Sequence, residues 1–337
     1  MTVSDAPVTT CYRHDRRESH IRCTRCDRYI CPDCMRSAAV GFQCPDCVRS
    51  GNKDVRQART VFGAAAGTTT PVATIGLIVL NFAVYAAELL HHSVSDRLAM
   101  LSDALTGPND ALYQPMAAPP GFHAIGVANG EWYRLITSSF VHLLPSDPPF
   151  GPTHILFNML SLWMFGVVLE QHIGRVRFLA VYLISAVGSS VMCYYLTEPY
   201  LHTVGASGAI FGLIGAYFVL SRRLHFDPLG AQRQLVIAIV WLVLSAKATS
   251  WQGHLGGLLT GVAAALVIAH APRPRQAALQ TAGLAAILAL LIGATAYHTT
   301  TRHTDDAQPR ATKGQPHGLH PAVAGDHPTE DLAGPPH

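Results

Sequence analysis

From residue 72 onward the chain alternates between long apolar stretches and short polar connections. A bilayer core of about 30 Å requires about 20 apolar residues in a helix. Seven stretches approach that length, and the fifth is the shortest; they are residues 72–90, 154–171, 178–196, 204–220, 235–249, 253–269 and 279–297. This pattern predicts an all-α polytopic membrane protein.

Basic residues gather at alternate ends of these stretches. Four of them precede the first span: Arg49, Lys53, Arg56 and Arg59. The others follow the second, fourth and sixth spans: Arg175 and Arg177, then Arg222, Arg223 and Arg233, then Arg273 and Arg275. Positively charged loops stay in the cytoplasm. We therefore expect a multi-pass protein of the plasma membrane with seven crossings, a cytoplasmic N-terminus and a C-terminus outside.

Composition supports the membrane assignment and excludes one class of partner. Only 13% of the 337 residues are charged and 49% are hydrophobic, whereas soluble domains carry about 25% charged residues. The formal net charge is only +3, and the basic residues form no patch. We therefore expect no nucleic-acid partner.

The polar N-terminal region carries a repeated pair spacing that is typical of zinc sites. Seven of the 8 cysteines lie there, and with one histidine they form four pairs, each separated by two residues: Cys11 and His14, Cys23 and Cys26, Cys31 and Cys34, Cys44 and Cys47. A tetrahedral zinc ion takes four such ligands. The eight ligands therefore predict two structural Zn²⁺ ions.

The second and third pairs are only four residues apart, so they cannot easily share one ion. We expect the first pair to join the third and the second to join the fourth, in a cross-braced arrangement. The spacing resembles a B-box type zinc finger, with Cys44 and Cys47 at positions where that family usually has histidines. Such a domain implies a cytoplasmic protein partner.

Two polar side chains within the apolar stretches predict catalytic chemistry. Ser207 opens the fourth stretch between small residues, and His254 opens the sixth. Both follow outer connections closely, so they share a side and a depth. A serine and a histidine at one depth indicate a nucleophile and its base, although the serine motif taken alone is better explained by close helix packing.

Further residues fit the same site. His154 and Asn158 lie at i and i+4 at the outer end of the second stretch, where they share one helical face, and their side chains can donate hydrogen bonds to an oxyanion. Small residues form matching seams on the fourth and sixth stretches, which include Gly208, Gly257 and Gly261. The seams let the two helices approach closely. No carboxylate lies in either stretch, so we expect a dyad without an acid partner.

Four motifs together resemble the rhomboid family of intramembrane serine proteases. They are Glu131-Trp-Tyr-Arg134, His154-x3-Asn158, Gly205-Ala-Ser207-Gly208 and His254-x2-Gly257-x3-Gly261. The resemblance covers residues 72–270. It implies a six-helix core with a seventh C-terminal helix (6+1), and hydrolysis of single-span membrane proteins near their outer boundary after a small residue, without a catalytic cofactor.

The resemblance also implies a role for each matching residue. Ser207 would be the nucleophile and His254 the general base and acid. The Ser207 backbone N–H would form the oxyanion hole with His154 and Asn158. The residues implied to give structural support are Glu131, Arg134, Glu170, Gly205, Gly208, Gly257 and Gly261.

The sequence therefore predicts five segments: a zinc-binding domain over 1–50, a linker over 51–71, the protease core over 72–270, the seventh span over 271–299 and a disordered tail over 300–337. Two other functions fit the same sequence. One is a catalytically silent rhomboid-like adaptor that binds membrane helices. The other is an interaction hub, such as a membrane-anchored ubiquitin ligase, in which the zinc domain is the functional part.

Overall fold

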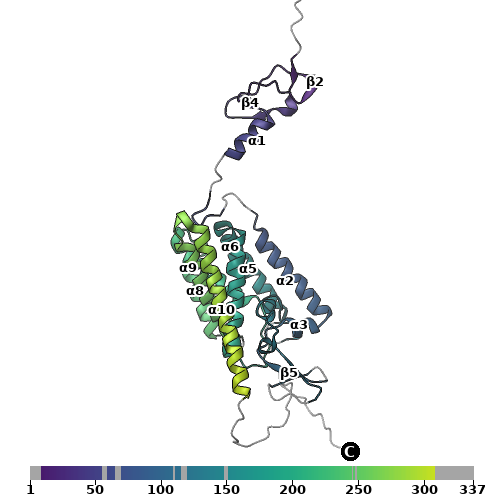
Figure 1. The fold of residues 1–337 in the computed structure, drawn as a ribbon, viewed down its shortest axis with the longest axis vertical. Helices are drawn as coiled ribbons and strands as arrows, with labels where there is room; N and C mark the ends of the chain where they lie inside the picture. Colours follow the sequence, from purple (N-terminus) through teal and green to yellow (C-terminus); the bar gives the residue numbers. More distant parts are fainter. Residues whose placement is uncertain are drawn as a thin grey trace, which may run out of the picture. The chain divides into compact units, whose positions relative to one another are not determined.

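The computed structural model describes residues 9–54, 59–64, 70–108, 111–114, 120–147, 151–244, 246 and 249–307. The chain divides into two compact units, Met1–Ala58 and Arg59–His337, and both can be followed in Figure 1. Each unit is described separately below.

The first unit is built from very short elements. Strands β1 (Thr10–Cys11) and β2 (His14–Glu18) form one antiparallel sheet, and β3 (Arg36–Ser37) and β4 (Phe42–Gln43) form another. A 3₁₀ turn η1 (Pro32–Cys34) and helix α1 (Pro45–Asp54) complete the unit. Its buried cluster consists of Ile30 and the sulfur-bearing side chains of six cysteines. So small a core needs cross-links or metal ions for stability.

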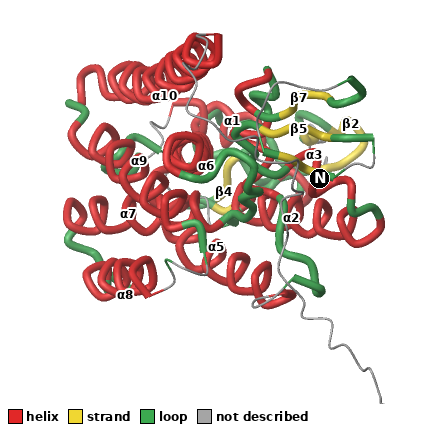
Figure 2. The backbone as a smooth tube through the Cα atoms, turned by 90° about the horizontal axis from the view of Figure 1, so that it is seen from below, coloured by secondary structure: helices red, strands yellow, loops and turns green. Residues whose placement is uncertain are grey.

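The second unit is a helical bundle. Its apolar helices are α2 (Val72–Leu90), α5 (Gly151–Ile173), α6 (Arg175–Leu196), α7 (Ser207–Leu224), α8 (Ala231–Leu244), α9 (Trp251–His270) and α10 (Gln276–Ala307). Figure 2 shows α6 in the middle of the bundle and α8 at its edge beside α7. The burial of the helices is consistent with the central place of α6. In its most apolar segment 61% of the residues are buried, against 22% for α2 and 11% for the span that overlaps α10.

Five of these helices are long and apolar enough to cross a membrane: Val72–Leu90, Gly151–Ile173, Arg175–Leu196, Trp251–His270 and Arg273–Arg302. Helix α8 is apolar but has only 14 residues, and α7 carries two charges, Arg222 and Arg223, in its last turn. Each predicted span overlaps one helix of the bundle. The total of seven crossings stays a prediction.

Helices α7 and α9 approach so closely that side chains are excluded from their seam. A Cβ atom on Gly257 would collide with the backbone carbonyl of Gly208, and one on Gly261 with that of Gly212. A Cβ atom on Gly208 would in turn collide with the Ser189 side chain of α6. Small residues at these positions let backbones meet where lipid gives no hydrophobic driving force.

We expect Gly257→Ala to destabilise the bundle, because the new methyl group meets backbone that cannot rotate away. The cost of such overpacking is about 1–3 kcal/mol. Gly76→Ala in α2 is the matched control, since nothing lies within 4 Å of a Cβ placed there, and it should be neutral or slightly stabilising. Thermal unfolding in detergent measures both. Equal midpoints for the two variants would contradict the close seam.

A long connection joins α2 to α5 and contains a small sheet that the sequence analysis did not predict. Strands β5 (Ala104–Thr106), β6 (Leu112–Tyr113) and β7 (His123–Ile125) pair in the order β6-β5-β7, all antiparallel. Strands of two or three residues are too short to show an alternating pattern. The same connection contains α3 (Ser93–Leu98), η2 (Val127–Asn129), α4 (Arg134–Thr137) and η3 (Ser138–Phe140).

Two predicted boundaries can be placed on the structure. Helix α1 continues through Asp54, beyond the predicted end of the zinc-binding domain at residue 50. Helix α10 runs for 32 residues to Ala307, so helix replaces the first part of the predicted tail. The rest of that tail, residues 308–337, lies outside the described residues.

Candidate active site

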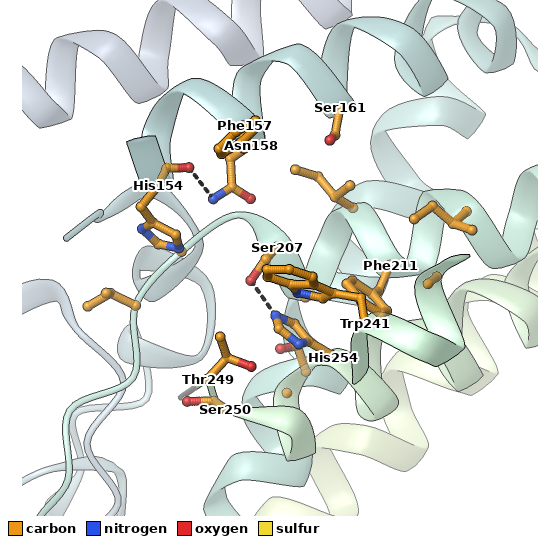
Figure 3. Close-up of a pocket in the computed structure, with 18 of the residues that line it drawn as sticks. His154, Phe157, Asn158, Ser161, Ser207, Phe211, Trp241, Thr249, Ser250 and His254 are labelled. Carbon is orange, nitrogen blue, oxygen red and sulfur yellow. Dashed lines mark hydrogen bonds between the residues drawn. The ribbon is translucent and has the colours of Figure 1, made fainter. Parts of the chain in front are cut away.

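Ser207 and His254 are in direct contact. Ser207 is the first residue of α7, and His254 lies in the first turn of α9. The Ser207 Oγ and the His254 Nε2 are 2.8 Å apart, which is hydrogen-bond distance (Figure 3). Because the Gly208 and Gly257 seam brings the two helices together, their first turns carry these side chains to one point.

The His254 ring is fixed by packing. It is 5% exposed and stacks on Phe211, with ring centroids 4.4 Å apart and ring planes 6° from parallel. Phe211 lies one turn after Ser207 on the same face of α7. Within the described residues, the His254 Nδ1 has no hydrogen-bond partner. Stacking on Phe211 therefore fixes the plane of the imidazole ring without a hydrogen bond to its Nδ1 from any described residue.

His154 is held in one tautomer by the backbone. Its Nδ1 lies 3.2 Å from the Leu143 backbone nitrogen, whose N–H can only donate. The neutral ring must therefore carry its proton on Nε2. A Cβ on Gly205 would lie 3.0 Å from this Nε2 and 3.6 Å from the Ser207 Oγ, which places a hydrogen-bond donor beside the serine.

Asn158 adds a second donor from the same helix. Its Nδ2 donates one hydrogen bond to the His154 carbonyl oxygen at 2.8 Å, which leaves a second N–H on the same nitrogen. The side chain is 6% exposed and lines the cavity that also contains Ser207 (Figure 3). The structure thus brings together the four polar residues that the sequence singled out.

The cavity around these residues has a volume of about 680 Å³. Side chains from α5, α7, α8 and α9 line it, among them Phe157, Ser161 and Trp241, together with Ser250, which immediately precedes α9 (Figure 3). Apolar and aromatic walls with a few converging polar groups are typical of a site for a peptide or small molecule. The sequence analysis did not single out Trp241 or Phe157, although an aromatic in the short fifth span was visible.

Gly205 allows the chain to enter α7 beside His154. Its φ of 120° is in the region that favours glycine, and a Cβ there would lie 2.8 Å from the His154 Cε1. Its N–H donates to the Ser138 carbonyl at 3.0 Å. Gly205 therefore fixes the distance between the serine and the His154 ring.

We expect Gly205→Ala to lower any activity that depends on this site by more than tenfold, because strain and contact both displace His154 or Ser207; 1 Å misplacements cost about 10². Gly293→Ala in α10 is the matched control, with nothing within 4 Å of its Cβ. Initial rates of reporter cleavage in liposomes compare the two. Wild-type rates in Gly205→Ala would contradict the required spacing.

Glu131 and Arg134 hold the outer connection together. The Arg134 Nε donates to Glu131 at 2.8 Å, and its Nη1 donates to the carbonyl oxygens of Asp96 and Ala99. Burial raises the pKa of Glu131, but the Gly126 N–H and the Arg134 guanidinium outweigh it, so the net shift is downward. Neither residue lines the cavity around Ser207, and the bonds of Arg134 tie separate parts of the connection together.

Glu170 lies at the other end of α5 and caps α2. Its carboxylate accepts hydrogen bonds from the N–H groups of Ala73 and Thr74 and from the Thr74 hydroxyl, at 2.8–3.0 Å. A helix N-terminus leaves such N–H groups without partners, and a negative charge there is favourable. Glu170 thus joins two apolar helices without reaching the cavity.

The cysteines of the first unit form two separate clusters. Cys11, His14, Cys31 and Cys34 supply one, and Cys23, Cys26, Cys44 and Cys47 supply the other. In each cluster the four ligand atoms lie within 4.8 Å of one another. The first pair joins the third and the second joins the fourth, as predicted, and each cluster could hold one metal ion.

Comparisons with known proteins place a family domain in the second unit. The Rhomboid domain model matches residues 129–271. The putative rhomboid protease YdcA of Bacillus subtilis (strain 168) is 40% identical over 143 residues, which are 41% of this chain and 67% of that protein. Rhomboid protease GluP of the same organism is 36% identical over 146 residues, 42% of this chain and 27% of that protein.

A plant relative is similar over a stretch of comparable length. RHOMBOID-like protein 6, mitochondrial, of Arabidopsis thaliana is 31% identical over 153 residues, 44% of this chain and 47% of that protein. The chain thus spans about half of the plant relative and about a quarter of GluP. The domain match includes Ser207, His254, His154 and Asn158, and the similarity reaches 67% of YdcA. The chain therefore belongs to the rhomboid family of multi-pass membrane proteins.

Proposed function

We propose that the protein is an intramembrane serine endopeptidase that uses Ser207 and His254 as a catalytic dyad. The observation that carries this proposal is the 2.8 Å contact between the Ser207 Oγ and the His254 Nε2, with hydrogen-bond donors on the same cavity. Rhomboid relatives whose names include protease support the class of activity. Catalysis would need no cofactor.

The first half of the reaction makes an acyl-enzyme. The Ser207 Oγ attacks the carbonyl carbon of a substrate peptide bond while the His254 Nε2 takes the hydroxyl proton. The carbonyl oxygen becomes an oxyanion, which accepts hydrogen bonds from the Ser207 N–H, the His154 Nε2–H and the second Asn158 N–H. The intermediate then expels the amine, which receives the proton held by His254.

The second half restores the enzyme. Water enters the cavity, gives a proton to the His254 Nε2 and attacks the acyl carbon. A second oxyanion forms in the same hole and then collapses, which breaks the bond to the Ser207 Oγ and releases the carboxylic acid product. His254 returns its proton to the serine, so the dyad ends as it began.

The substrate we propose is a single-span membrane protein cut near its outer boundary after a small residue. The cavity lies among apolar helices, so its substrate arrives from the bilayer. A helix shields its own carbonyl groups, and the segment must therefore unwind locally before Ser207 can reach one. We place the protein in the plasma membrane with six core helices, α10 as a seventh, the N-terminus in the cytoplasm and the C-terminus outside.

For the first unit we propose a B-box-like zinc-binding domain with two structural Zn²⁺ ions. Thiolate and imidazole donors in fours fit tetrahedral zinc, and the cross-braced clusters supply two such sets. We propose that this domain recruits a cytoplasmic protein partner. The clusters belong to a unit of their own, and none of their residues is among those that line the cavity around Ser207.

The experiment that tests the proposed function uses purified protein in liposomes with a fluorescent single-span reporter whose boundary contains small residues. We expect two products, with the cut mapped by mass spectrometry near the outer boundary. Binding of the reporter without any cleavage would instead support a silent adaptor. Binding that is lost on deletion of residues 1–58, again without cleavage, would support an interaction hub.

A further inference from the structure

Glu88 is a buried carboxylate that the proposed reaction does not use. It lies near the C-terminal end of α2 and is 0% exposed. Its oxygens accept the Ser95 hydroxyl at 2.6 Å and the His142 backbone N–H at 3.1 Å. A carboxylate enclosed in an apolar bundle is costly to keep, so its partners are informative.

The His142 amide is the first of three consecutive N–H groups that bond to side chains. The His142 N–H donates to Glu88, the Leu143 N–H donates to the His154 Nδ1 at 3.2 Å, and the Leu144 N–H donates to the Asp147 Oδ2 at 2.7 Å. Side chains from three places in the sequence therefore fix this short backbone segment. Its middle amide faces the oxyanion donor.

That middle amide decides which nitrogen of His154 can donate. While the Leu143 N–H occupies Nδ1, the imidazole proton stays on Nε2, beside Gly205 and Ser207. If the amide turned away, Nδ1 could take the proton, and Nε2 would present a lone pair to the oxyanion. The nearby His142 ring does not substitute, because neither of its nitrogens bonds to any described residue, although it packs 5.2 Å from the His154 ring.

We propose that Glu88 is a positioning residue that keeps His154 in its donating tautomer. It does so by holding the His142 peptide group, which sets the direction of the next amide, that of Leu143. The effect on catalysis rests on the proposed function, whereas the effect on the tautomer does not. Glu88 touches neither the cavity nor the reacting atoms.

Three variants separate this role from a structural one. Glu88→Leu keeps the side-chain volume but removes the acceptor. Glu88→Gln keeps an acceptor for His142, and its NH₂ group can donate to the Ser95 oxygen. Ser95→Ala is the matched control, because it removes the other hydrogen bond to the same carboxylate without touching the path to His154.

We expect Glu88→Leu to lower kcat on the order of tenfold with little change in KM, since complete loss of one oxyanion donor costs roughly 10²–10³-fold in kcat and this variant loses it in only a share of the molecules. Glu88→Gln should restore kcat to within about threefold of wild type, and Ser95→Ala should match wild type, because both variants keep an acceptor for the His142 N–H and so keep the donor. Reporter cleavage in liposomes gives these values. An unchanged kcat in Glu88→Leu, or a loss in Ser95→Ala as large as in Glu88→Leu, would overturn the proposal.

The tautomer is read independently by ¹⁵N NMR of histidine-labelled protein, with the His154 signals assigned by their loss in His154→Gln. We expect the Nε2-protonated form in wild type and Glu88→Gln, and a large share of the Nδ1-protonated form in Glu88→Leu. An unchanged His154 spectrum in Glu88→Leu would overturn the proposal even if its unfolding temperature fell. If the His154 spectrum shifts in Glu88→Leu but wild type cleaves no reporter, the positioning role of Glu88 is supported and the proposed protease activity is rejected.

Discussion

Replacing Ser207 with alanine is expected to abolish reporter cleavage, with a loss of at least about 10³-fold in kcat. The Oγ is the only atom removed, and it is the atom 2.8 Å from the His254 Nε2. His254→Ala should cause a loss of the same order, because nucleophile and base act as one unit. The double variant should therefore be no worse than either single variant, as in subtilisin.

Ser161→Ala is the matched control for this prediction. Ser161 lines the same cavity from α5, so its loss removes a serine hydroxyl without disturbing the dyad. We expect wild-type cleavage in Ser161→Ala and a cooperative unfolding transition in all four variants, with a lower midpoint only where the buried His254 ring is removed. Cleavage that survives Ser207→Ala would exclude Ser207 as the nucleophile.

Cys31→Ser is expected to remove at least one of two bound zinc ions and to unfold the first unit. Cys31 is fully buried, and its sulfur lies 3.2 Å from the His14 Nδ1 within the first cluster. Structural zinc supplies about 10–16 kcal/mol of apparent binding free energy in small domains. Burial of Ile30 and six cysteines contributes too little free energy to keep the unit folded without the metal.

Elemental analysis and limited proteolysis test this prediction together. Wild type should contain about two zinc ions per chain and resist cleavage between residues 11 and 47, while Cys31→Ser should lose metal and be cut there. Cys193→Ser is the matched control, because Cys193 is a buried thiol of α6 outside both clusters. Equal zinc content in wild type and Cys31→Ser would show that the first cluster does not bind zinc. Reporter cleavage by Cys31→Ser should persist, since the bundle is a separate unit.

The contact between Ser207 and His254 could be predicted from the sequence, because both residues lie at the beginning of predicted helices. Ser207 and His254 each open an apolar stretch after an outer connection, so helix geometry alone gives them a common depth. The glycines Gly208 and Gly257 then indicate that the two helices touch. Pair spacing likewise fixed the two metal clusters, because four residues between Cys26 and Cys31 leave the cross-braced grouping as the simplest one.

Other features could not be read from the sequence. The tautomer of His154 depends on the Leu143 amide, and a backbone group carries no sequence signal. The burial of Glu88 could not be predicted either, because a single acidic residue near a helix end is usually exposed to solvent. The strands β5 and β7 are too short for periodicity, and their pairing is set by contacts across the loop.

The most direct test of the central claim is covalent labelling of the purified protein with an alkyl fluorophosphonate, followed by peptide mapping. The reagent is attacked by an activated serine, which displaces fluoride and forms a stable ester. We expect one label on Ser207 in wild type and none on any serine in His254→Ala, because an unactivated hydroxyl is a weak nucleophile. Labelling at another serine, or equal labelling of Ser207 with and without His254, would contradict the proposed dyad.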